Sequence, residues 1–144
     1  MVGLLHKHAR YEIVEAIREA ERRTGGEIRV HVRPRCGQDP MKEARKVFQK
    51  LRMHRTREHN AVLIFVAVQS RRFAIVGDEG IHQKVGDGFW DSVSQEMQGL
   101  FKKNDIVGGI VAAVRGVGEK LTQHYPSRQH DKNELSDSMS EDPR

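Results

Sequence analysis

The stretch AVLIFVAVQSRRFAIVGDEG, residues 61–80, decides the fold of this chain. Residues 61–68 are apolar throughout, and polar Asn60 and Gln69 bound them. A short run that is apolar on both of its alternating faces predicts a strand buried on both sides of a sheet. This strand is therefore expected at the centre of the core.

A second strand follows after a loop of three residues, Gln69 to Arg71. A loop this short predicts a β-hairpin, so residues 72–76 should run antiparallel to the first strand. Asp78 and Glu79 come directly after it. Because ligands in open α/β sheets commonly bind at strand ends, any site in this chain is expected to begin at these two acids.

The remaining elements are predicted from hydrophobic periodicity and from capping residues. Residues 27–33, EIRVHVR, alternate apolar and polar side chains and predict a strand buried on one face, near a sheet edge. The predicted helices are 7–23, a helix that starts at Pro40 after the N-cap Asp39, a short turn over 81–85, 88–102 with Asp87 as N-cap, and 107–124.

The order of these elements predicts an α/β fold with a small mixed sheet. The helix after Pro40 makes a βαβ crossover, so strands 27–33 and 61–68 should be parallel. The hairpin then adds one antiparallel strand. In this topology Glu27 and Asn60 should border Asp78 and Glu79 at one rim of the sheet.

The chain is predicted to form one domain, residues 1–125, followed by a disordered polar tail, residues 126–144. Only Leu135 and Met139 are large apolar residues between Ser127 and Arg144, among many charges. No apolar run reaches the roughly 18 residues of a transmembrane helix, and the first residues lack the pattern of an export signal. Cys36 is the only cysteine, which excludes an intrachain disulfide, and the cytoplasm is the expected compartment.

The positive charge of the chain leaves nucleic acid as one alternative partner. The net charge is +5, and residues 18–57 carry thirteen Lys and Arg against five Asp and Glu, a net of +8. Such a region can bind phosphates with strong salt dependence. However, Phe48 is the only aromatic residue within it, and it lies on an apolar helix face, so platforms for base stacking are missing.

Acidic residues near the predicted rim suggest a site for a hard cation. Ca²⁺ and Mg²⁺ prefer carboxylate and carbonyl oxygens. The spacing of an EF-hand does not occur, and each acid also has an ordinary role as a helix cap, turn residue or solvated side chain. No histidine pair has metal-ligand spacing. The candidate ligands are Asp78, Asp87, Asp91, Glu27, Glu79 and Asp105.

The chain resembles the TPM domain family, which is named after a thylakoid lumen protein, a photosystem II repair protein and a modulator of an acetylcholine receptor. The resemblance covers about Leu5 to Tyr125. It rests on AIREAERRTGGEIRVHV, AVLIFVAVQSRRFAIVGDEGI, FWDSVSQEMQGLF and GGIVAAVRGVGEKL.

The resemblance implies a three-layer α/β/α sandwich around the mixed sheet. Members of the family are associated with divalent-cation binding, with acid phosphatase activity in some plant proteins, and with the assembly of membrane complexes. The resemblance places Asp78, Asp87 and Asp91 at the family's acidic cluster. It therefore implies a Ca²⁺- or Mg²⁺-binding interaction module with an unknown protein partner, or alternatively a metal-assisted phosphatase.

Overall fold

A computed structural model describes residues 5–86, 88–127 and 139–142. Its elements are α1 (Lys7–Arg23), β1 (Glu27–Arg33), α2 (Pro40–Lys50), the short 3₁₀ helix η1 (Met53–Arg55), β2 (Ala61–Ala67), β3 (Arg72–Gly77), α3 (Glu79–Val85), α4 (Asp91–Lys102), α5 (Ile106–His124) and β4 (Met139–Glu141). Within these ranges, no helix combines the length and apolarity that a bilayer crossing requires.

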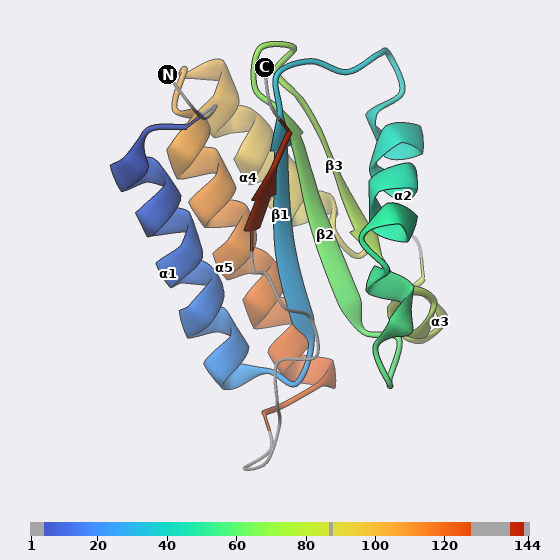
Figure 1. Cartoon of the computed structure of the whole chain (residues 1–144). Helices are drawn as coiled ribbons and strands as arrows, with labels where there is room; N and C mark the ends of the chain where they lie inside the picture. The colour runs from blue at the N-terminus through green and yellow to red at the C-terminus, as the bar shows by residue number, and fades with distance from the viewer. Residues whose placement is uncertain (1–4, 87, 128–138, 143–144) are drawn as a thin grey trace.

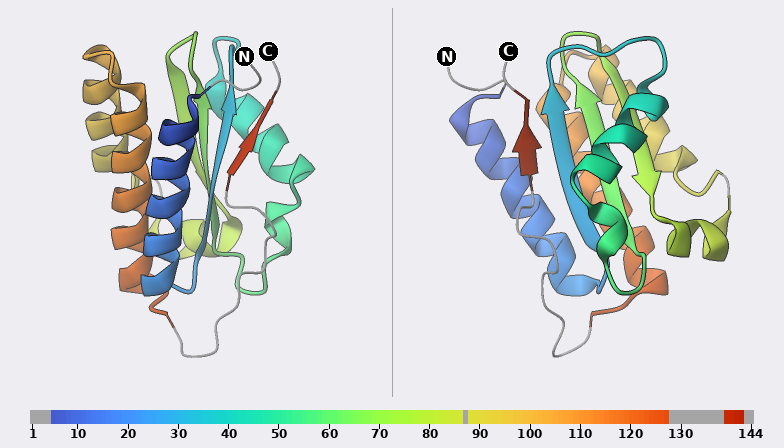
Figure 2. Two further views of the ribbon diagram at one scale, coloured as in Figure 1. Left: turned by 60° about the vertical axis from the view of Figure 1, so that its left-hand side comes forward. Right: turned by 45° about the vertical axis from the view of Figure 1, so that its right-hand side comes forward.

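The sheet has the strand order β3-β2-β1-β4 (Figure 1). β1 and β2 are parallel, and β2 and β3 are antiparallel, as predicted. One face of the sheet is covered by α1, α4 and α5, and the other by α2 (Figure 2). The structure therefore confirms the α/β fold and the three layers.

The side chains of β2 explain why this strand lies at the centre. Val62, Ile64 and Val66 belong to the core cluster that packs under α1, α4 and α5. Leu63 and Phe65 belong to a second cluster, which α2 closes. Because successive side chains of a strand point to opposite faces, one apolar run supplies both cores.

β1 differs from its prediction as a strand buried on one face near a sheet edge. It lies between β2 and β4, and its polar face is covered, so Arg29 and His31 are only 6% and 5% exposed. The cover comes in part from β4, which pairs in parallel with residues 30–32.

The predicted disordered tail is wrong for residues 139–142, because Met139–Glu141 form β4 and Asp142 donates a backbone hydrogen bond to Val32. Pro126 also forms a bridge with Thr24. Residues 128–138 lie outside the described residues. The start of the fourth helix differs too, since α4 begins at Asp91 rather than at residue 88.

Candidate functional site

The end of β3 forms a corner with the loop that precedes β2. Asp78 directly follows the strand, and its backbone N–H donates to the carbonyl of Ala61. Its Oδ1 accepts a hydrogen bond of 2.7 Å from the backbone N–H of Glu79, so the carboxylate caps α3. Ala61 is in register with Glu27 on β1. These backbone contacts therefore bring the starts of β1 and β2 and the end of β3 together at one rim of the sheet, as the topology predicted.

Two buried oxygen atoms in this corner have no hydrogen-bond partner among the described residues. They are Asp78 Oδ2 and Asn60 Oδ1. Asp78 is 7% exposed and Asn60 is 1% exposed, so water cannot easily satisfy them. The Nδ1 atom of His59 lies 3.4 Å from Asp78 Oδ2, but the His59 side chain is 53% exposed. Both acceptors are hard oxygens of the kind that Ca²⁺ and Mg²⁺ prefer.

Backbone carbonyls add further oxygens to this corner. A Cβ atom built on Gly80 would lie 2.5 Å from the carbonyl oxygen of Glu58 and 2.6 Å from that of His59. Only glycine permits such a close approach of two backbones. The first turn of α3 is therefore held directly against the loop that carries Asn60.

Two acidic side chains act on the Tyr125 phenol beside this corner. Burial, followed by the charges of Glu58 and Asp78, raises the pKa of this phenol. The Nζ atom of Lys84 lies 4.1 Å from the centre of the Tyr125 ring.

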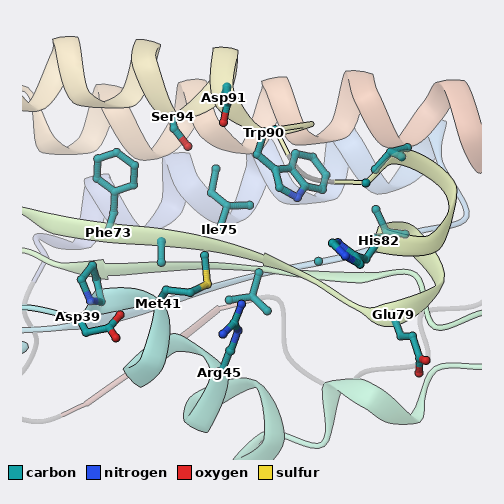
Figure 3. A pocket seen from close by; sticks show the side chains of 18 residues that line it. Asp39, Met41, Arg45, Phe73, Ile75, Glu79, His82, Trp90, Asp91 and Ser94 are labelled. Atoms are coloured by element: carbon teal, nitrogen blue, oxygen red, sulfur yellow. The ribbon is translucent and has the colours of Figure 1, made fainter.

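A cleft of about 620 Å³ begins beside this corner and follows β3 (Figure 3). Its junction with the corner is the contact of Gly77 with Trp90, whose Nε1 would lie 3.4 Å from a Cβ on Gly77. Asp91, which follows Trp90 in the chain, lines the cleft, and Glu79 lines it as well. Asp78 follows Gly77 and Asp91 follows Trp90, so the chain places one acid next to each partner of this contact.

Two of the other predicted ligands, Glu27 and Asp105, make other contacts. Glu27 is buried at the start of β1 and hydrogen-bonds with Glu21, whose pKa is raised by burial despite the hydrogen bonds from Ile28 and Glu27. Asp105 caps α5 by accepting from the N–H of Gly108, at the far end of α4 from Asp91. The helix α4, which begins at Asp91 and has 12 residues, is about 18 Å long and lies between the two acids.

Asp87 lies outside the described residues. Within the described ranges, no three or more His, Cys, Asp or Glu residues form a group that could hold a metal ion on their own side chains. A cation at the corner would therefore need the amide of Asn60, backbone carbonyls or water in addition to Asp78.

The sequence does not predict that α2 contributes to the cleft. Asp39, Met41 and Arg45 line it opposite α4. Asp39 was correctly predicted as the N-cap of α2, where it accepts from the N–H of Lys42. This wall of the cleft depends on the packing of α2 over β3, in which Ala74 and Val76 share a core cluster with Ala44, Val47 and Phe48.

The basic residues of the 18–57 region do not form one surface. Those of α1, including Arg18 and Arg22, lie in the layer with α5, whereas those of α2, including Lys42 and Lys46, lie beyond the opposite face of the sheet (Figure 2). Arg33 pairs with Glu43 at 3.2 Å. This division gives no continuous track for a phosphate backbone.

Comparison with known proteins agrees with this architecture. The family model for the TPM domain matches residues 1–120. The NMR structure of the BA42 protein from the psychrophilic bacterium Bizionia argentinensis is 37% identical, with 96% of each chain covered and a TM-score of 0.88. No curated protein matches the sequence.

A more distant solved structure shows the same fold. The N-terminal domain of the cg2496 protein from Corynebacterium glutamicum is 15% identical, with 94% of this chain and 80% of that chain covered and a TM-score of 0.59. At this identity only the fold is compared. The family model, in contrast, spans most of the sequence, and the similarity to BA42 extends over nearly all of it. This chain belongs to the TPM domain family.

Proposed function

We propose that this TPM domain is an interaction module that binds a divalent cation, Ca²⁺ or Mg²⁺, at the corner between the 58–60 loop and the end of β3. The observation that carries the proposal is the buried Oδ2 of Asp78, which has no hydrogen-bond partner among the described residues. A buried carboxylate oxygen without a partner is costly, and a bound cation would remove that cost.

The ligands that would hold the cation are oxygens. Asp78 would supply its free carboxylate oxygen and Asn60 its amide oxygen, with the carbonyls of the 58–59 segment close by. Asp91, which lines the neighbouring cleft, is a candidate for completing the shell. Ca²⁺ accepts six to eight such ligands, and Mg²⁺ retains several waters. The exposed ring of His59 would have to turn away from Asp78.

A bound cation would supply positive charge beside two acidic side chains, Glu58 and Asp78. It would also join the start of α3 to the loop before β2, since Asp78 caps that helix and Asn60 belongs to that loop. The expected result is a more rigid rim beside the cleft. Because Asp78 is not among the residues that line the cleft, the cation would act as a structural support for it.

Thermal unfolding with and without the cation tests this proposal. At a Ca²⁺ concentration a hundred times its Kd, the folded state gains about 2.7 kcal/mol, which raises Tm by roughly 5–15 °C in a domain of this size. Titration of Ca²⁺ and of Mg²⁺ near neutral pH should show which cation gives this shift.

Two matched variants identify the ligand. Asp78→Asn and Asp105→Asn each replace a helix N-cap by another good N-cap, so each removes a negative charge at little structural cost. Asp78→Asn should abolish the cation-dependent rise in Tm, and Asp105→Asn should retain it. A wild-type Tm that neither cation changes, or an Asp78→Asn variant that keeps the full shift, would refute the proposal.

A further inference from the structure

The outer edge of β3 is one of the two edges of the sheet, and β4 forms the other. Among the residues that the structure describes, β3 pairs with β2 alone. In an antiparallel pair, residues that bond to the neighbouring strand alternate with residues whose backbone groups point outward. Asp78 donates to Ala61, so the alternation assigns Phe73, Ile75 and Gly77 to the outward-facing set.

The cleft lies along this edge. It is lined by the consecutive residues 73–77, whose side chains belong alternately to the two faces of the sheet. Figure 3 shows Phe73 and Ile75 between Asp91 and Ser94 of α4 on one side and Met41 and Arg45 of α2 on the other. The cleft therefore has a strand edge as its floor and one helix as each wall.

The shape of the cleft favours a single extended peptide strand over the β3 edge of a second copy of this chain. Residues 73–77 span about 17 Å, and the spacing to a neighbouring strand is about 4.8 Å. A second copy that presented its own β3 would also have to fit its α2 and α4 beside these helices. An extended peptide has no such flanking helices.

The composition of the edge also indicates a docking function. Residues 73–77 are FAIVG, without the charged residue or proline that usually protects an exposed edge from pairing. Glycine within a strand often marks the close approach of another backbone, and Gly77 is such a glycine. Trp90 and Met41 line the same cleft and are residue types enriched at binding sites.

The charge of the cleft selects among peptides. Its lining includes three carboxylates, those of Asp39, Glu79 and Asp91, against the guanidinium of Arg45. With His82 neutral, this is a net charge of −2 on a chain whose net charge is +5. An acidic cleft on a basic protein favours a partner segment that carries lysine or arginine.

We propose that the cleft binds an extended basic and apolar segment of a partner protein, which adds to the sheet as a strand beside β3. Main-chain hydrogen bonds to the outward-facing residues would give affinity, and the walls would select apolar and basic side chains at alternate positions. This inference goes beyond the cation site and does not require a bound cation.

Amide hydrogen exchange measured by NMR, with a chelator present, tests the proposal. The probe is a heptapeptide of alternating lysine and valine, and its charge control is the heptapeptide of alternating glutamate and valine. At saturation, the lysine peptide should slow exchange at Phe73, Ile75 and Gly77 about tenfold or more. The amides of Arg72, Ala74 and Val76, which already face β2, should change little. The glutamate peptide should bind at least tenfold more weakly.

A pair of substitutions at one position separates backbone pairing from shape. Gly77→Pro removes an outward N–H, whereas Gly77→Ala adds a Cβ at the same place and keeps the N–H. A Cβ there lies 3.4 Å or more from Trp90 and Ile81, which is near ordinary contact. Gly77→Pro should weaken peptide binding about tenfold relative to Gly77→Ala, the loss expected for one hydrogen bond. If Gly77→Pro fails to fold, a peptide N-methylated at alternate residues removes the same bonds from the other partner.

A matched pair of charge variants tests the selectivity. Asp39→Asn should weaken binding of the lysine peptide about two- to fivefold, the range of an exposed ion pair, and Asp105→Asn should not change it. No binding of the lysine peptide at millimolar concentration, or protection confined to other residues, would overturn the proposal. Protection of Phe73, Ile75 and Gly77 that grows with protein concentration in the absence of peptide would also overturn it, because a second copy would then be the occupant.

Discussion

The imidazole of His31 and the carboxylate of Asp142 are 111 residues apart in the chain, and their Nε2 and Oδ2 atoms lie 3.0 Å apart. The Oγ of Ser140 lies 2.8 Å from the other ring nitrogen, and a guanidinium nitrogen of Arg33 lies 3.0 Å from Asp142. These contacts fasten β4 to the polar face of β1. They also explain how a histidine in the middle of a strand is buried.

The first prediction concerns pH and stability. Burial lowers the pKa of His31 below its usual 6.5, although the hydrogen bond and charge of Asp142 act in the opposite direction. The unfolded chain therefore binds more protons than the folded chain between the folded pKa and 6.5. The contribution of His31 to stability should be fully present above about pH 6.5 and should be lost as pH falls through the folded pKa.

Denaturant unfolding at a series of pH values measures this contribution. The free energy of unfolding of wild type should fall between about pH 7 and the folded pKa of His31 more steeply than that of His31→Gln, which does not titrate there. The difference between the two proteins isolates His31 from the other histidines. Parallel pH profiles would contradict the prediction.

The second prediction concerns the ion pair itself. Asp142→Asn removes the carboxylate that raises the pKa of His31, so that pKa should fall further below 6.5. NMR titration of the His31 ring measures it directly, and Asp105→Asn serves as a control distant from β4. An unchanged His31 pKa in Asp142→Asn would show that β4 is not docked on β1 in solution.

The features of this structure that could be predicted from the sequence are those that depend on residues close together in the chain. The buried β2, the hairpin and the N-cap Asp39 follow from local patterns, and all are confirmed. The burial of His31 could not be predicted in this way, because a segment more than a hundred residues away covers it. An alternating pattern indicates a half-exposed strand unless the cover is known.

The candidate site shows the same division. The adjacency of Asp78 and Asn60 follows from strand topology, and the structure shows it through the bond between Asp78 and Ala61. Asp91 begins α4 and Asp105 follows its end, so the length of this helix separates the two acids. The number of residues between them does not by itself show where in space the helix leads. The cleft depends on the packing of α2 over β3, which is a contact between elements and has no local pattern.

The third prediction tests the close approach of α3 to the loop before β2. Gly80→Ala places a Cβ 2.5 Å from the carbonyl oxygen of Glu58, so the backbone must shift and stability should fall by about 1–3 kcal/mol. Gly99→Ala is the matched control, because Gly99 lies in α4 with nothing within 4 Å of its Cβ position. This control should gain roughly 0.5–1 kcal/mol. Equal effects of the two substitutions in chemical denaturation would contradict the close contact.

The last prediction separates the two roles of Asp78 in the absence of any divalent cation. Its Oδ1 caps α3, and this role survives in Asp78→Asn but not in Asp78→Ala. With a chelator present, Asp78→Ala should therefore lose about 1 kcal/mol relative to Asp78→Asn. Removing the buried charge should leave Asp78→Asn close to wild type, because its second oxygen has no hydrogen-bond partner among the described residues. Its 3.4 Å contact with His59 involves a side chain that is 53% exposed, so the loss of this contact should cost little.

The measurement is urea unfolding of the three proteins in chelator and again with Ca²⁺ or Mg²⁺. The cation should widen the gap between wild type and Asp78→Asn while leaving the gap between Asp78→Asn and Asp78→Ala unchanged, since neither variant keeps the carboxylate. If the cation leaves the gap between wild type and Asp78→Asn unchanged, Asp78 contributes its cap alone. The oxygen that attracts the cation would then have to be sought at Asn60 or in the backbone of the loop before β2.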